Sequence, residues 1–239
     1  MRKEALILSI GLMLSSPALA ADDNNPGQCS LSRNIVNMIQ GQLAVVAQLN
    51  NGGLFQPSRM WSAVVDRQGV LCSVIRNDPD AWPGSRAIAI AKASTANDFS
   101  NNILALSTAN LYSLTQPANN FVGNPPTTVP AGSLYGLNNS NPFNPSFPPR
   151  PDVGTTPGGI ITFGGGVPLY LNGQVIGGLG VSGDTACADH AIAYRMRRNA
   201  GFNGIPTPGN DNIDYLELGE LPHDFKHPHC IVGRDIVTP

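Results

Sequence analysis

The segment after residue 183 carries side chains whose types and spacing could bind iron or a carboxylate. Cys187, His190 and Tyr194 occupy positions i, i+3 and i+7, so a helix would place all three on one face. An imidazole and a phenol on one stripe could ligate iron, or could donate hydrogen bonds to a bound carboxylate. The structural alternative is that Cys187 forms a disulfide, His190 is buried with its hydrogen bonds made and Tyr194 belongs to the core.

The C-terminal region holds the remaining histidines. The chain has four histidines, and three of them, His223, His227 and His229, lie within seven positions. Imidazoles at this density could hold a transition metal or a haem iron. The alternative is that Cys230 anchors this segment through a disulfide and that the histidines are exposed.

Glycines form a third group, at 164–166, 177–178 and 180. No Gly-Lys-Ser/Thr sequence accompanies them and none follows a GxGxxG spacing, so they do not predict a phosphate-binding loop. Glycine instead permits tight turns and a close approach to the sheet, either by another backbone or by a flat ligand. The Ser182-Gly183-Asp184 turn is not a GxSxG elbow, so nothing here predicts a hydrolase.

Composition limits the class of partner. The 239 residues carry a formal charge of −2, and only 13% of them are charged. A nucleic-acid-binding surface needs a basic excess, which this chain does not have, so we expect no nucleic-acid partner. The hydrophobic fraction of 41% is enough to bury a core.

The N-terminus predicts export. Arg2 and Lys3 precede the apolar stretch 5–14, which is too short to span a bilayer, where about 20 residues are needed. Small residues at Ala18 and Ala20 then match a signal-peptidase site, which predicts a signal peptide over residues 1–20. We expect a periplasmic or secreted protein, and no later stretch is apolar and long enough to predict a membrane span.

Four cysteines remain after that cleavage. An even number in an oxidising compartment favours two disulfides, and four cysteines allow three pairings between which the residues alone do not choose. No CxxC sequence is present, so neither a thioredoxin-like site nor a zinc ribbon is predicted. The cysteines are Cys29, Cys72, Cys187 and Cys230.

The periodicity of apolar residues predicts helices and hairpins in an α+β domain with an antiparallel sheet flanked by helices. Alternating βαβ units are absent. The predicted elements are a helix over 33–48, a hairpin over 61–65 and 70–75, a helix capped by Ser85 that runs toward Phe99, a weaker helix at 103–106, strands at 160–163, 167–171 and 174–181 with an Asn172-Gly173 turn, and a helix capped by Asp184 that ends at Asn199.

Two regions do not fit that pattern. Residues 112–158 contain ten prolines together with asparagine-rich runs, which predicts a long insertion rather than a core element. A polar tail follows from about residue 202. We therefore expect a single domain over residues 21–239 that carries both additions.

Two blocks of sequence resemble the GlcG/HbpS-type family of haem-binding proteins, also described by its haem-degrading domain. The first block has a VVD-x-x-G hairpin at 64–69 and an A-x-x-KA-x-TA helix at 89–96. The second has GGVP at 165–168, GVSG at 180–183 and D-x-A-I-A at 189–193. The resemblance covers about residues 33–110 and 158–200.

This resemblance implies a profilin-like fold, a haem or related tetrapyrrole ligand, and assembly into homo-oligomers. The resemblance does not place the family's iron ligand on a specific position of this sequence. Because haem needs an axial donor and a cation for its propionates, our candidates from the residues are His190 and Tyr194 as donors and Arg86 or Arg76 as cations. The cysteine region resembles a secreted subgroup of the family, with a GD-x-x-C-x-DH-x-IA sequence and an HP-x-C sequence, which implies a Cys187–Cys230 disulfide. Cys29–Cys72 would then be the second disulfide.

The implied function is periplasmic haem binding, for storage, sensing or degradation, and whether the protein is an enzyme stays open. Two alternatives remain. One is a non-catalytic accessory module for an exported redox enzyme, in which the insertion and the tail cover the pocket. The other is a small-molecule enzyme, such as an isomerase, that uses the same crevice.

Overall fold

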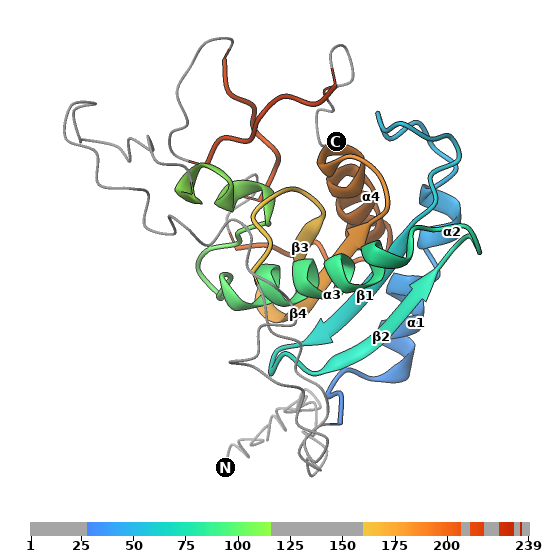
Figure 1. Ribbon diagram of the computed structural model, residues 1–239. Helices are drawn as coiled ribbons and strands as arrows, with labels where there is room; N and C mark the ends of the chain where they lie inside the picture. Colours follow the sequence, from blue (N-terminus) through green and yellow to red (C-terminus); the bar gives the residue numbers. More distant parts are fainter. Residues whose placement is uncertain (1–27, 116–159, 207–210, 218–224, 232–234, 236–239) are drawn as a thin grey trace, which may run out of the picture.

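A four-stranded antiparallel sheet forms the centre of the computed structural model, which describes residues 28–115, 160–206, 211–217, 225–231 and 235. The strand order is β2-β1-β4-β3, so two hairpins meet through the antiparallel pair β1–β4 (Figure 1). The predicted signal peptide and residues 116–159 of the predicted insertion lie outside the described residues. The strands are β1 (Trp61–Asp66), β2 (Leu71–Arg76), β3 (Gly166–Leu171) and β4 (Gln174–Ser182).

Helix α3 (Pro83–Asp98) covers one face of the sheet and packs very close to β4. A Cβ atom at Gly178 or Gly180 would collide with the carbonyl oxygens of Ala93 and Ala89 in α3. Glycine at these two positions therefore allows the helix to approach the strand. The alternative, that these glycines lie beneath a flat ligand, is wrong because α3 occupies that space.

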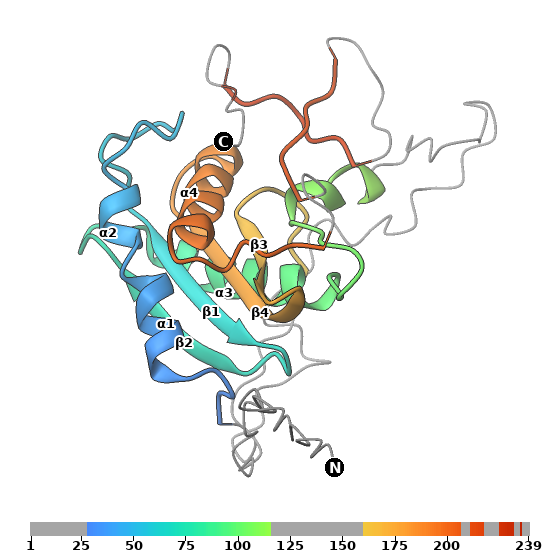
Figure 2. The same cartoon turned by 180° about the vertical axis from the view of Figure 1, so that it is seen from behind.

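Helices α1 (Arg33–Gln40), α2 (Leu43–Val46) and α4 (Ala186–Asn199) cover the opposite face, as Figure 2 shows from behind. Burial of apolar side chains between these helices and the sheet builds the largest core of the molecule. Its buried members are Ile39, Leu43, Val46, Ala47, Met60, Val64, Val167, Leu169, Leu179, Val181, Ile192, Ala193, Met196 and Phe202.

The α+β class with an antiparallel sheet is confirmed, and so are both predicted hairpins. Asn172 and Gly173 have φ values of 52° and 76°, as a two-residue hairpin turn requires. The predicted helix over 33–48 is divided at Gly41, after Ser32 caps α1 by accepting a hydrogen bond from the Ile35 amide.

Two expected elements do not form. Residues 103–106 are not helical, because the Asn101 side chain accepts hydrogen bonds from the amides of Ile103 and Leu104 and turns the chain. Short 3-10 helices at Ala109–Leu111 and Ser113–Thr115 follow. Residues 160–163 are not a strand, and the Ile161 amide donates to Thr95 Oγ1 in α3 instead.

Both predicted helix caps are also wrong. Helix α3 begins at Pro83, directly after Trp82, without a side-chain cap, since proline presets φ in the first turn. Helix α4 is capped by Thr185, whose hydroxyl accepts from the Ala188 amide. The Asp184 carboxylate instead accepts hydrogen bonds from the backbone amides of residues 54 and 55.

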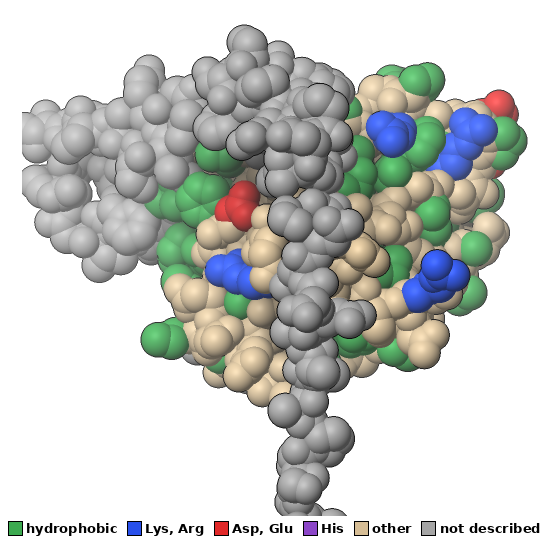
Figure 3. All heavy atoms as spheres, turned by 90° about the horizontal axis from the view of Figure 1, so that it is seen from below, with side chains coloured by type: hydrophobic (Ala, Val, Ile, Leu, Met, Phe, Trp, Pro, Cys, Tyr) green, Lys and Arg blue, Asp and Glu red, His purple; other side chains and the backbone are tan. Residues whose placement is uncertain are grey.

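The surface view in Figure 3 shows one face of the molecule, on which apolar side chains are interspersed with polar ones. Lys and Arg side chains stand apart on the described part of that face and do not gather into one patch. Within the described residues, no helix combines the length and the hydropathy needed to cross a bilayer.

Candidate functional site

His190 lies at the centre of the candidate site, on the side of α4 that faces the C-terminal tail. Its side chain has no exposed surface. Neither Nδ1 nor Nε2 has a hydrogen-bond partner among the described residues. Burial lowers the pKa of His190 to about 3, and the nearby His227, Arg197 and Lys92 act in the same direction. The imidazole is therefore neutral at physiological pH, the form that ligates metals.

Gly164 joins His190 to the tail. A Cβ atom at Gly164 would lie 2.9 Å from the His190 Cβ, so the backbone there packs directly on the histidine. The Gly164 amide donates to His227 Nε2 at 3.3 Å, and His227 Nδ1 is 2.7 Å from the Pro228 carbonyl oxygen. Because Nε2 accepts, Nδ1 carries the proton and donates to that carbonyl. Both nitrogens of His227 are thus engaged.

Aromatic rings surround His227 and His190. Tyr112 and Tyr215 lie 5.7 and 6.4 Å from the His227 ring, between ring centroids. Tyr194 lies 6.2 Å from His190 and has the Arg197 guanidinium 4.9 Å above its ring centre. Burial lowers the pKa of His227 to about 4, so this enclosed region holds two neutral imidazoles.

The predicted histidine metal site is not assembled among the described residues. His223 lies outside them, and His229 is exposed, stacked on Tyr215 and 2.6 Å from Asp235 through Nδ1. That hydrogen bond is the main reason that the pKa of His229 is raised. In the described chain, potential metal-binding groups cluster only at Cys29, Asp66 and Cys72, whose two sulfur atoms form a disulfide.

Both disulfides that the resemblance implies are present, Cys29–Cys72 and Cys187–Cys230. The second one begins one helical turn before His190 and ends three residues after His227. It therefore ties the tail to the face of α4 that carries His190. Cys187, His190 and Tyr194 share this face, as their spacing predicts, and all three are buried.

A buried ion pair lies next to His190 in the sequence. Lys92 Nζ is 2.6 Å from Asp189 Oδ2, and both side chains are almost fully buried. Lys92 also donates to the Val181 carbonyl and lies 4.8 Å from the Phe163 ring centre. Burial raises the pKa of Asp189 to about 6 and lowers that of Lys92. This pair connects α3 to α4 past the end of β4.

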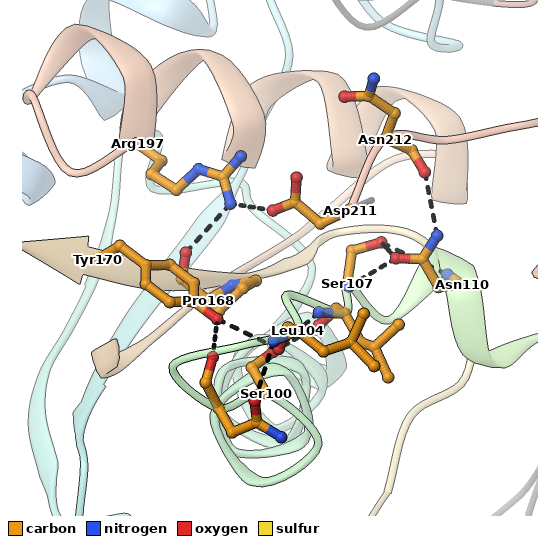
Figure 4. Close-up of polar contacts among 11 residues, drawn as sticks. Ser100, Leu104, Ser107, Asn110, Pro168, Tyr170, Arg197, Asp211 and Asn212 are labelled. Carbon is orange, nitrogen blue, oxygen red and sulfur yellow. Dashed lines mark hydrogen bonds and ion pairs between the residues drawn. The ribbon is translucent and has the colours of Figure 1, made fainter. Parts of the chain in front are cut away.

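A second buried ion pair holds the next part of the tail. Arg197 of α4 contacts Asp211 and donates to the Pro168 carbonyl of β3 (Figure 4). Nearby, the Asn110 side chain donates to the Asn212 carbonyl. Residues 211 and 212 are therefore fixed against α4, β3 and the first 3-10 helix. The predicted polar tail is thus an ordered part of the site in its described portions.

The two predicted propionate partners lie elsewhere. Arg76 ends the edge strand β2, where it lies over Trp61 and donates to the Pro79 carbonyl. β1 and β4 separate that strand from β3, which follows Gly164. Arg86 is exposed in the first turns of α3. The structure does not bring either guanidinium into the contacts around His190.

Sequence reasoning missed Lys92, Asp189 and Asp211, and with Asp211 the ion pair that Arg197 makes. One signal was available for Lys92, which interrupts the apolar run from Ala87 to Ala93 and so needs a buried partner. No comparable local signal marks Asp211, because its partner Arg197 is set by how the tail folds back.

Chemically, this arrangement offers a buried, neutral nitrogen donor that has no hydrogen-bond partner among the described residues and lies beside the Tyr194 ring. A neutral imidazole of this kind fits an axial ligand of haem iron. Because His190 has no exposed surface, an incoming ligand reaches it only after a neighbouring segment moves.

Comparisons with known proteins were consistent with the sequence motifs. Residues 44–197 match the family model described as haem degrading protein HbpS-like. A 64-residue stretch is 41% identical to an uncharacterised 15.0 kDa protein from the dhaT–dhaS intergenic region of Citrobacter freundii, covering 27% of this chain. The chain spans about a third (34%) of the length of that relative.

Two solved structures have a similar fold. The crystal structure of a PduOC:heme complex superposes with a TM-score of 0.51 at 24% identity, covering 73% of this chain and 98% of that one. The Klebsiella pneumoniae protein ORFY gives a TM-score of 0.50 at 24% identity, covering 75% of this chain and 95% of its own. At this identity, the likeness concerns the fold.

Proposed function

We propose that this chain, which belongs to the HbpS-like family of haem-degrading proteins, binds haem with His190 as the axial ligand. The observation that carries the proposal is the fully buried imidazole, whose two nitrogens have no hydrogen-bond partner in the described part of the chain. A buried polar group without a partner costs about 1–3 kcal/mol, so its retention is explained by a ligand that pairs with it. Relatives with a similar fold include PduOC, whose structure is described as a heme complex.

The residues beside His190 would position such a ligand. His190 would supply the nitrogen donor, and Tyr194 would supply an aromatic surface at the adjacent helical turn. Arg197, held above Tyr194 and paired with Asp211, would contribute positive charge near a propionate. Bound haem would supply the iron chemistry, and the protein would orient the ring and restrict water.

A hemin titration followed at the Soret band tests this function. The wild-type protein should give a saturable Soret shift, and His190→Leu should lose it or weaken binding at least tenfold. His229→Leu is the matched control, because His229 is a histidine of the same region with an exposed side chain. A shift that is equal in wild type and His190→Leu would reject His190, and no saturable shift in wild type, either with its disulfides intact or after their reduction, would reject haem binding.

The biological role follows as a further part of this proposal: haem storage, sensing or degradation outside the cytoplasm. The signal-peptide sequence at residues 1–20 and the two disulfides support a periplasmic or secreted location. Loss of the Soret band under a reductant and oxygen would assign degradation, and a persistent band would assign storage or sensing. Exported protein with an N-terminus other than Ala21 would contradict the expected cleavage.

We also propose, from the family resemblance, that the protein assembles into homo-oligomers. Sedimentation of the mature protein with and without hemin measures this directly. A single monomeric species at micromolar concentration in both samples would reject it.

A further inference from the structure

We propose that the Cys187–Cys230 disulfide is a redox-sensitive latch, whose reduction releases residues 225–231 and exposes His190. The release of residues 225–231 and the exposure of His190 do not depend on any ligand. Their consequence for ligand binding rests on the proposed haem function. In the oxidised state, the disulfide holds the tail on the face of α4 that carries the buried imidazole. In the reduced state, the same imidazole becomes available to solvent.

The position of the disulfide supports this role. Cys187 belongs to the helical face of His190, and Cys230 belongs to the segment whose His227 contacts Gly164, which packs on His190. The disulfide therefore fastens the covering segment within one helical turn of the group that it covers. Among the described residues, no other disulfide joins the tail to the sheet or the helices.

Besides the disulfide, residues 225–231 are held by hydrogen bonds, several of them made by backbone groups, and by side-chain packing. Phe225 packs against a buried leucine cluster, and the rings of His227 and His229 contact Tyr112 and Tyr215. The Ser113 hydroxyl donates to the Lys226 carbonyl at 2.5 Å. The backbone of His227 pairs with residues 214 and 216, and its ring accepts from Gly164. By contrast, residue 211 is held by the buried Arg197–Asp211 ion pair. Reduction should consequently release the segment around Cys230 before it releases residues 211–217.

The two cysteine residues differ in exposure. Cys187 is buried, whereas Cys230 is partly exposed. A dithiol reductant can therefore attack the Cys230 sulfur, form a mixed disulfide with it and expel the Cys187 thiolate. The second thiol of the reductant then releases Cys230. The protein disulfide gains two electrons and two protons to become two thiols, and the reductant is oxidised to a disulfide.

The other disulfide provides a matched control within the same chain. Cys29–Cys72 has the same sequence separation of 43 residues, but it joins the segment before α1 to β2. Its surroundings are the Asp66 carboxylate and Ser30, which donates to that carboxylate through both its amide and its hydroxyl. Because neither of its cysteines lies in the tail, removing this disulfide leaves the contacts of the tail in place.

The test measures histidine accessibility in the ligand-free protein, with diethyl pyrocarbonate as the probe and peptide mass spectrometry as the readout. We expect the modification rate of His190 to rise at least tenfold in Cys187→Ser/Cys230→Ser and to stay near wild type in Cys29→Ser/Cys72→Ser. Unchanged His190 reactivity in the first variant, with His229 modified normally, would overturn the latch.

A second measurement avoids dependence on variant folding. Wild-type protein is compared by hydrogen exchange before and after treatment with dithiothreitol, with circular dichroism used to verify that helices persist. Faster exchange confined to residues 225–231 and to the start of α4 supports the latch, and equal or global exchange overturns it. A hemin titration of the reduced protein then separates the two proposals: accessible His190 without a Soret shift supports the latch and rejects haem binding.

Discussion

The two sides of α4 differ in whether their buried polar side chains have hydrogen-bond partners. On the sheet side, Asp189 is paired with Lys92 and also accepts a hydrogen bond from the Asp184 amide. On the tail side, the next residue, His190, is equally buried and has no hydrogen-bond partner among the described residues. Polar groups whose bonding capacity is filled within the chain stabilise the fold, whereas an unfilled one favours a ligand. From this difference we expect Asp189 to stabilise the fold, and we propose that His190 serves binding.

The largest effect should come from breaking the paired side. Asp189→Leu leaves the Lys92 ammonium buried without its counter-charge, which should lower the free energy of unfolding by about 3–5 kcal/mol. Urea unfolding at pH 7 measures it. The double variant Lys92→Met/Asp189→Leu should recover most of the loss, because it removes both charges. If the single variant lost under about 1 kcal/mol, the pair would not have the structural role assigned to it.

On the side of α4 that carries His190, replacement by leucine should not lower the free energy of unfolding as it does at Asp189. His190→Leu replaces a buried, unpaired imidazole with an apolar side chain of similar size. We expect the free energy of unfolding to stay unchanged or to rise by up to about 2 kcal/mol, since no internal hydrogen bond is lost. Urea unfolding measures this change. If the free energy of unfolding fell by more than about 2 kcal/mol, His190 would be shown to stabilise the fold.

The pH dependence of stability sharpens this contrast. The pKa of His190 is lowered from 6.5 to about 3 in the folded protein, so below pH 6.5 the unfolded chain binds more protons. Its contribution to stability is complete above pH 6.5 and is lost as the pH falls toward 3. Between pH 6 and 4, His190→Leu should flatten the stability curve by about 1.4 kcal/mol per pH unit. Parallel curves for wild type and variant would contradict the buried neutral imidazole.

A small effect should come from Thr185, which caps the N-terminus of the helix that carries both Asp189 and His190. Thr185→Ala removes the hydroxyl that accepts from the Ala188 amide, which should cost about 1 kcal/mol. Thermal unfolding measures it, and hemin affinity should stay within twofold of wild type. A large loss of affinity would mean that the start of α4 positions His190 more directly than its hydrogen bonds indicate.

Elements set by local patterns were the predictable part of this molecule. Short runs of β-branched and apolar residues and the Asn172-Gly173 turn specify the hairpins, and the shared face of Cys187, His190 and Tyr194 follows from helical spacing. Caps were less predictable, because Asp184 and Thr185 are both good capping residues. Distant loop amides at residues 54 and 55 decided which of them serves as the cap.

Contacts between distant segments could not be predicted from spacing. The position of His227 depends on the Gly164 amide, 63 residues away, and the Arg197–Asp211 pair forms only once the tail returns to α4. Arg76 and Arg86 were chosen as free cations near the ligand. The position of Arg76 depends on strand order, which places β2 at the opposite edge from β3, and Arg86 is exposed in the first turns of α3.

The identity of the iron ligand is the most direct test of the central claim. Protein labelled with 15N-histidine is loaded with ferric haem, and pulsed electron paramagnetic resonance measures the hyperfine coupling of the axial nitrogen. The account predicts a 15N-imidazole coupling in wild type and in His229→Leu, and its disappearance in His190→Leu. The same coupling in all three proteins, or none in wild type, would contradict it.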